Sequence, residues 1–69
     1  MGHPVIPVRF FTPYGRVITT VNFPIPNEGV DQLPDKVISA ANDAFGDNWG
    51  SAILVGMNLV IRNPKETNK

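Results

Sequence analysis

The chain has 69 residues, which limits it to a single small domain, and its six basic and six acidic side chains give a formal net charge of zero. A protein that coats DNA carries a clear basic excess, so this balance argues against that class. The absence of cysteine excludes disulfides and thiolate sites. Only 17% of the residues are charged, below the roughly 25% typical of soluble domains. We therefore expect part of the surface to be buried against a partner protein or in a homodimer.

The sequence carries no signal for a membrane or for export. No apolar run approaches the roughly 20 residues of a membrane span. Residues 1–10 lack the charged region and the cleavage site of a signal peptide. We expect a cytoplasmic protein that makes no membrane contact. Residues 1–69 are expected to form one domain, with frayed ends at residues 1–4 and 64–69.

Residues 5–23 have the pattern of a β-hairpin. The first strand runs from Val5 to Phe11, and Pro7 within it cannot donate to a sheet ladder, which predicts that this strand lies at an edge of the sheet. The second strand is expected over residues 16–23. Apolar side chains alternate along both strands and are expected to face one core: Ile6, Val8, Phe10, Val17, Val21 and Phe23.

The turn at residues 12–15 decides which side chains share a face. Pro13 and Gly15 suit a tight turn, because proline presets φ and glycine accepts positive φ. We expect a four-residue loop that places Phe11 opposite Arg16, because both apolar sets then lie on one face. The resulting pairs are Phe10 with Val17, Val8 with Thr19, and Ile6 with Val21. The alternative is a three-residue loop with a bulge at Gly15, which pairs Phe11 with Val17 and separates the two sets.

Residues 31–45 have the pattern of one amphipathic helix, which follows a proline-containing connector at residues 24–29. Asp31 is the expected N-cap, and Pro34 falls in the first turn, where its missing N–H leaves no bond unmade. Gly46 is expected to end the helix. The stripe that faces the sheet is expected to contain Leu33, Val37, Ala40, Ala41, Ala44 and Phe45.

Two short strands are expected at the C-terminal end, over residues 51–55 and 59–62, around Gly56-Met57-Asn58. A single long strand with a glycine bulge is the competing interpretation. The fold class is therefore α+β, a small β-β-α-β-β domain with an N-terminal hairpin and a C-terminal strand pair in one sheet and a single helix on one face. Trp49 is expected to close the core beneath the helix end, and Tyr14 to be exposed at the turn tip.

No group of residues points to catalysis or to a bound cofactor. His3 is the only histidine, and without cysteine it needs several converging carboxylates to make a zinc site. Asp31 and Asp35 are explained by helix capping and dipole compensation. The sequence has no nucleophile–base motif and no phosphate-binding glycine loop. We predict that the protein is not an enzyme and binds no metal and no cofactor.

One helix covers one face of four strands, so the other face is expected to stay open. We expect Ile53, Val55, Leu59 and Ile61 to point inward. The open face then carries Arg9, Phe11, Arg16, Ile18, Thr20, Asn22, Leu54, Val60 and Arg62. The candidate partner-binding residues are Arg9, Phe11, Tyr14, Arg16, Ile18, Val60 and Arg62.

Two functions suit such a face. Arginine and aromatic side chains among aliphatic ones are typical of protein interfaces, whereas single-stranded nucleic acid needs more stacking aromatics and more positive charge. We expect a protein-interaction module that uses the open face or a strand edge, and rank a single-stranded nucleic-acid binder as the alternative. No motif assigns the chain to a family. Its plan resembles that of phage and mobile-element accessory proteins that bind and block a host protein, which implies an inhibitor or adaptor.

Overall fold

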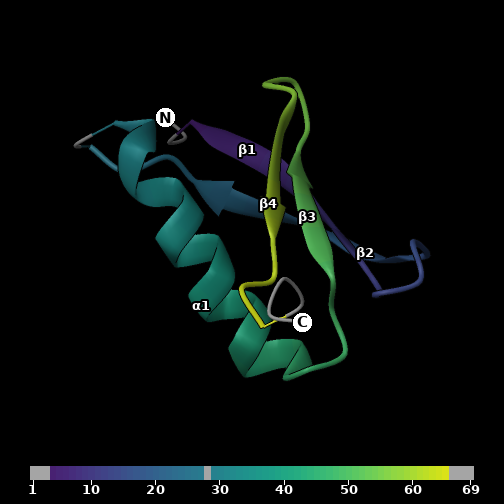
Figure 1. Cartoon of the computed structure of the whole chain (residues 1–69). Helices are drawn as coiled ribbons and strands as arrows, with labels where there is room; N and C mark the ends of the chain where they lie inside the picture. The colour runs from purple at the N-terminus through teal and green to yellow at the C-terminus, as the bar shows by residue number, and fades with distance from the viewer. Residues whose placement is uncertain (1–3, 28, 66–69) are drawn as a thin grey trace.

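The computed structural model describes residues 4–27 and 29–65, which form one open four-stranded sheet with a helix along one side (Figure 1). The elements are β1 (Val5–Phe11), β2 (Val17–Pro24), a 3-10 turn η1 (Val30–Gln32), α1 (Leu33–Phe45), β3 (Ser51–Leu54) and β4 (Leu59–Arg62). All paired strands are antiparallel. The predicted α+β class and β-β-α-β-β order are confirmed.

β1 lies inside the sheet, whose strand order is β2-β1-β3-β4. The prediction that Pro7 places this strand at an edge is therefore wrong. The Pro7 carbonyl accepts a hydrogen bond from the Val55 N–H at 3.0 Å, so the proline nitrogen also faces the β3 side. The register between β1 and β3 begins only at Val8 opposite Leu54. Pro7 thus lies just past the last paired residue of β3, where its missing N–H removes only the terminal bond of the ladder.

The turn between β1 and β2 is the three-residue alternative, so the predicted four-residue loop is wrong. The Thr12 N–H donates to the Arg16 carbonyl at 2.7 Å, and the Gly15 N–H donates to the Thr12 carbonyl at 2.9 Å. Gly15 has a φ of 89°, which side-chain-bearing residues rarely adopt. The Thr12 hydroxyl accepts the N–H groups of Tyr14 and Arg16, at 3.2 and 3.1 Å. These extra bonds to Thr12 favour the tighter loop.

A second irregularity, in β2, changes which side chains of the hairpin share a face. Phe11 is opposite Val17, yet Phe10 is opposite Thr19, which leaves Ile18 as the extra residue of a β-bulge. Beyond the bulge the pairs are Phe10 with Thr19, Val8 with Val21, and Ile6 with Phe23. The predicted register is therefore wrong by two residues. The bulge nevertheless returns Thr19 and the odd residues after it to the face of the apolar β1 residues, as predicted.

The helix begins later than predicted. Residues 30–32 form η1, in which the Leu33 N–H donates to the Val30 carbonyl, and α1 starts at Leu33 with Gln32 before it. Asp31 is therefore not the N-cap, because it belongs to this tighter preceding turn. Pro34 does lie in the first turn. The buried positions of α1 are Leu33, Val37 and Ala41, while Ala44 from the predicted stripe is exposed. The helix ends at Gly46, as predicted.

β3 and β4 form a hairpin, as predicted, and the single-strand alternative is wrong. Leu54 is opposite Leu59, and residues 55–58 make the turn between them. Gly56 and Asn58 adopt positive φ angles of 94° and 54° in this turn. Both residue types tolerate this conformation better than others do. β3 is one residue shorter than predicted, because Val55 already belongs to the turn.

Phe10 lies at the centre of the core between α1 and the sheet. Its ring centroid is 5.3 Å from that of Phe45, 6.1 Å from that of Phe23 and 6.3 Å from that of Trp49, the last in an edge-to-face arrangement. Such tilted arrangements are the favourable ones for aromatic pairs. The fully or nearly fully buried apolar side chains are Ile6, Val8, Phe10, Leu33, Val37, Ala41, Trp49, Ala52, Leu54 and Ile61. The predicted burial of Trp49 is confirmed.

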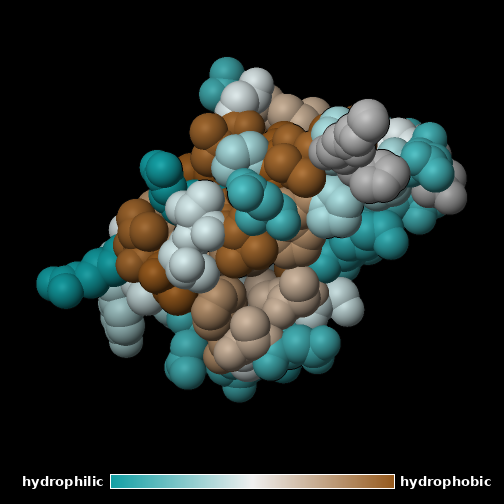
Figure 2. Space-filling view, turned by 180° about the vertical axis from the view of Figure 1, so that it is seen from behind, coloured by the Kyte–Doolittle hydropathy of each residue, from teal (hydrophilic) through white to brown (hydrophobic). Residues whose placement is uncertain are grey.

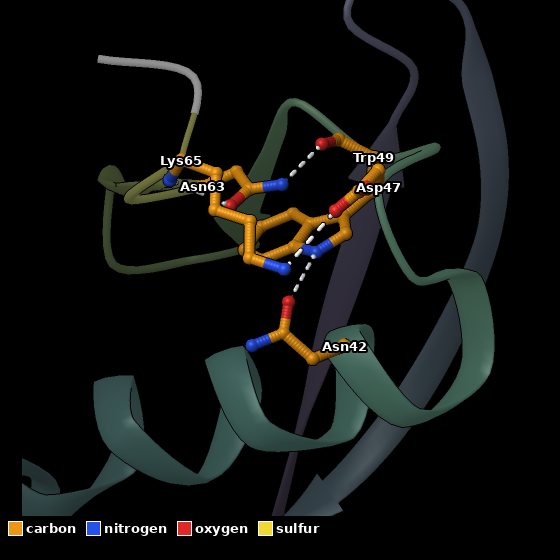
Figure 3. A network of polar contacts seen from close by, with 5 residues as sticks. All are labelled: Asn42, Asp47, Trp49, Asn63 and Lys65. Atoms are coloured by element: carbon orange, nitrogen blue, oxygen red, sulfur yellow. Dashed lines mark hydrogen bonds and ion pairs between the residues drawn. The ribbon is translucent and has the colours of Figure 1, made fainter. Parts of the chain in front are cut away.

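Residues 46–50 form the loop between α1 and β3, which we call the Trp49 loop. A set of polar contacts fixes it to the helix and to the end of β4 (Figure 3). The Trp49 indole N–H donates to Asn42 Oδ1 at 3.1 Å, and the Asn63 side-chain amide donates to the Trp49 carbonyl at 2.7 Å. Asn63 is buried, and its Oδ1 accepts the Lys65 N–H at 3.0 Å. Lys65 also forms an exposed ion pair of 3.1 Å with Asp47. Both polar atoms of the buried Asn63 side chain are thus hydrogen-bonded.

Gly50 joins this loop to the first hairpin. Its N–H donates to the Phe11 carbonyl at 2.8 Å, and its own carbonyl accepts the Asn63 N–H at 2.9 Å. A Cβ atom at this position would lie 2.7 Å from the Pro13 Cα, closer than real Cβ contacts come. The backbone approach between the Trp49 loop and the β1–β2 turn therefore requires glycine.

Some expectations about the chain ends fall outside the described residues, namely those for residues 1–3, including His3, and for residues 66–69. Within the described part, the Pro4 carbonyl accepts the Ile25 N–H at 3.1 Å, and Lys65 makes the two contacts given above. Pro4 and Lys65 thus contact the rest of the chain, and the expectation of frayed ends stays a prediction. Among the described residues, no helix has the length and hydropathy needed to cross a membrane.

Candidate functional site

The sheet surface that faces away from α1 is the candidate site, and we call it the open face. Residues directly opposite each other in an antiparallel sheet point to the same side. Val8 is opposite Leu54 and Phe10 is opposite Ala52, and all four are buried under α1. The alternate positions therefore form the open face. They are Val5, Pro7, Arg9 and Phe11 from β1, Val17, Thr20, Asn22 and Pro24 from β2, Ser51 and Ile53 from β3, and Val60 and Arg62 from β4.

The register arranges the centre of this face as two rows that cross all four strands. The first row is Thr20, Arg9, Ile53 and Val60. The second row is Val17, Phe11, Ser51 and Arg62. Each row has an arginine and two apolar side chains. The face is therefore mixed in character along its whole width, and neither hairpin alone supplies it.

Apolar side chains on this face are incompletely covered. Val17 is 57% exposed and Val60 is 50% exposed, at the two outer strands, while Phe11 and Ile53 between them are half-buried. Val5 is also exposed. Figure 2, which shows the molecule from behind Figure 1, has brown apolar side chains gathered over a broad area with teal polar side chains among them. A contact that covers the valines of the open face would remove apolar surface from water, which is favourable.

The charge on the open face is positive. Arg9 is exposed and donates its Nε–H to the Thr20 hydroxyl at 3.3 Å, and Arg62 is exposed at the end of β4. None of the residues that form the open face is acidic. The exposed Asp35 and Asp43 lie on α1, on the other side of the sheet. A partner that binds the open face would therefore meet two arginine side chains and no carboxylate among the residues of that face.

Four of the predicted site residues lie on the open face, namely Arg9, Phe11, Val60 and Arg62. Tyr14 is 92% exposed at the turn tip, as predicted, and Arg16 is exposed just before β2. Ile18 does not belong to the open face. It packs against the buried core, because the turn places Val17 on the open face and the next residue in the strand points to the helix side. Tyr14 and Arg16 therefore adjoin the face at one end.

The predicted alternation in β3 is also wrong. Leu54 is fully buried in the core, whereas Ile53 lies on the open face, the reverse of the assumption. Leu59 and Ile61 do point to the helix side, as assumed. Both β3 residues are aliphatic, so composition does not separate them. The pairing of β3 with β1 decides which of the two residues is buried. These strands are separated in the chain by the helix, so their pairing has no local sequence signal.

Sequence reasoning missed Val17 and Asn63 as well. Val17 was expected in the core, and the three-residue turn, which pairs it with Phe11, places it on the open face instead. Asn63 was not considered, although an asparagine followed by proline directly after an apolar strand is a place where a side chain often bonds to backbone. It supports the sheet end where Arg62 lies, rather than the face itself.

The described residues offer no enclosed chemical site. Residues 4–27 and 29–65 contain no pocket and no group of three or more side chains that could hold a metal ion. The predicted absence of enzymatic activity and of cofactors stays a prediction, since nothing tests it directly. Comparison of the chain with family models, with curated proteins and with solved structures found no match in any of the three.

Proposed function

We propose that this protein is a non-enzymatic module that binds another protein through its open face. The observation that carries the proposal is the row-by-row arrangement of half-exposed valines and central, half-buried apolar side chains on the side of the sheet without a helix. We further propose that it acts in the cytoplasm as an inhibitor or adaptor. This part rests on the low charge of the chain and on the resemblance of its plan to phage and mobile-element accessory proteins.

The chemistry of the face favours a protein over a single-stranded nucleic acid. Fully burying a valine side chain contributes roughly 1.5–3 kcal/mol, so Val17 and Val60 together offer a substantial apolar gain on contact. Nucleotides would have to stack on aromatic side chains, and Phe11 is the one aromatic residue of the open face. Arg9 and Arg62 are suited to pair with carboxylates at the rim of a protein interface. A partner with an apolar patch and neighbouring acidic residues fits these features.

The test starts from capture of a partner and ends with a titration. Tagged wild-type protein is used to isolate a partner from its natural source, and the purified partner is then titrated calorimetrically. We expect Val60→Asp and Arg9→Glu each to weaken binding roughly tenfold or more. Val60→Asp replaces an apolar contact by a charged group, and Arg9→Glu reverses the charge of a contact. Lys36→Glu, on the exposed side of α1, is the matched control and is expected to leave the affinity unchanged.

The outcomes separate the two functions. Equal affinity of the wild type, Val60→Asp and Lys36→Glu would show that the partner does not use the open face. A parallel titration with a mixed-sequence single-stranded oligonucleotide at low salt tests the alternative. Binding that weakens steeply with salt and is lost in Arg9→Glu but kept in Val60→Asp would replace the proposal by nucleic-acid binding. Far-UV circular dichroism of each variant shows that it is folded.

A further inference from the structure

β2 presents a long, unpaired edge. Within residues 4–27 and 29–65, β2 pairs with β1 on one side and with no segment on the other. It spans eight residues, twice the four of β4, which is the other outer strand. Natural proteins protect such edges with charged side chains, prolines and bulges, because an unpaired edge recruits further strands. On β2 the protection is confined to its ends, with the bulge at Ile18 and the proline at Pro24.

The hydrogen bonds of β1 show which groups of β2 point outward. The Pro7 carbonyl faces β3, where it accepts the Val55 N–H, and the Pro4 carbonyl faces β2, where it accepts the Ile25 N–H. Even residues of β1 therefore direct their backbone groups to β2. Their partners in β2 are Thr19, Val21 and Phe23, whose backbone N–H and C=O groups therefore point toward β1. The intervening Thr20 and Asn22 consequently direct their N–H and C=O groups away from the sheet.

The side chains along this edge are compatible with a second identical edge. No residue of β2 is charged, and the whole chain has zero net charge, so two copies meet without like-charge repulsion. Val21 lies midway between the outward-facing Thr20 and Asn22, on the helix side of the sheet, and is 41% exposed. The edge of β4 differs, since one of its two outward positions is the charged Arg62.

We infer that β2 pairs with β2 of a second copy in an antiparallel, two-fold symmetric arrangement centred on Val21. Thr20 is then opposite Asn22 of the second copy, and each such pair exchanges two backbone hydrogen bonds. The two Val21 side chains meet on the axis and cover each other's exposed surface. This register uses both outward-facing residues of each copy and stops before the bulge and Pro24, where the edge ends.

The pairing continues the sheet across both copies. Opposite residues of an antiparallel pair point to the same side, so both helices lie on one side of the joined sheet and both open faces lie on the other. The dimer therefore presents two open faces side by side to one partner surface. This inference does not depend on the proposed function, because the edge of β2 and the open face involve different groups.

The test uses charge substitutions at the symmetry axis. Sedimentation equilibrium of the wild type at increasing concentration up to millimolar is expected to show a monomer–dimer equilibrium. Val21→Glu and Val21→Lys are each expected to raise the dimer dissociation constant roughly tenfold or more, because like charges meet on the axis. A mixture of the two variants is expected to restore dimers, since Glu and Lys then lie opposite each other. Val60→Glu, an exposed valine on β4, is the matched control.

Three results would overturn the inference. One is a wild type that stays monomeric at millimolar concentration. Another is a dimer that both Val21 variants leave intact, or that the mixture does not restore although circular dichroism shows both variants to be folded. The third is a dimer broken by Val60→Glu, which would assign self-association to the open face. The proposed function is judged separately, because a monomeric Val21→Glu protein that still binds the captured partner would keep it.

Discussion

The two faces of the sheet are made by the same four strands and yet end in different states. The covered face is closed by α1 and by interlocking aromatic side chains around Phe10. The open face carries apolar residues of the same kinds, but Val17 and Val60 remain at least half exposed. Hydrophobicity alone therefore does not decide which side chains make the core. The pairing of strands decides it, and a single helix of 13 residues has enough surface to cover one side only.

The largest expected effect concerns Trp49 on the covered side. Trp49→Ala removes a fully buried ring that contacts Phe10, and we expect the free energy of unfolding to fall by about 3–5 kcal/mol. In a domain this small, that loss is a large part of the total stability. Tyr14→Ala, at an exposed aromatic position, is the matched control and is expected to change it by less than about 0.5 kcal/mol. Urea unfolding followed by far-UV circular dichroism measures both, and similar losses in the two variants would contradict the described core.

An intermediate effect is expected at Asn63, where the covered side is closed by polar contacts. Asn63→Ala removes the side-chain amide that donates to the Trp49 carbonyl, so this carbonyl loses its hydrogen bond from Asn63. We expect a loss of about 1–3 kcal/mol in the free energy of unfolding. Asn48→Ala is the control, because the Asn48 side chain is exposed. If the two variants unfold at the same urea concentration, Asn63 does not hold the loop.

The smallest effect is expected on the open face, and it tests the comparison directly. Val60→Thr exchanges a methyl group for a hydroxyl that water can solvate, so the free energy of unfolding should change by less than about 0.5 kcal/mol. The same exchange at Val8 buries the hydroxyl under α1 and is expected to cost about 1–3 kcal/mol. Urea midpoints of the two variants give the difference. Equal costs would mean that Val60 is as enclosed as Val8.

Local signals were sufficient for the elements and for part of the core. Alternating apolar residues predicted β1 and its inward set, and Pro34 and Gly46 marked the ends of the helix within a few residues. Trp49 was expected to be buried from its size and its place after the helix. These inferences depend only on residues near one another in the chain, where propensity and periodicity act directly.

The errors arose where a bulge or a distant pairing sets the outcome. Val17 lies on the open face and Ile18 on the helix side because the three-residue turn pairs Phe11 with Val17. The bulge at Ile18, which no glycine or proline announces, then returns Thr19 to the helix side. Pro7 is accommodated in an inner strand only because β3 ends beside it, and Leu54 is buried because β3 pairs with β1 across the helix. Four of the seven predicted site residues nevertheless lie on the open face, since the alternation within β1 and β4 was read correctly.

The inner position of β1 also bears on the order in which the chain folds. β1 and β2 are joined by the five residues 12–16 and can pair early, because closing so short a loop costs little entropy. The other edge of β1 is completed only when β3 arrives, about forty residues later in the chain. During that interval Arg9 and Phe11 direct unpaired backbone groups outward, while Pro7 beside them has no N–H to offer a foreign strand. The proline therefore shortens the edge that is open to aggregation before the sheet is complete.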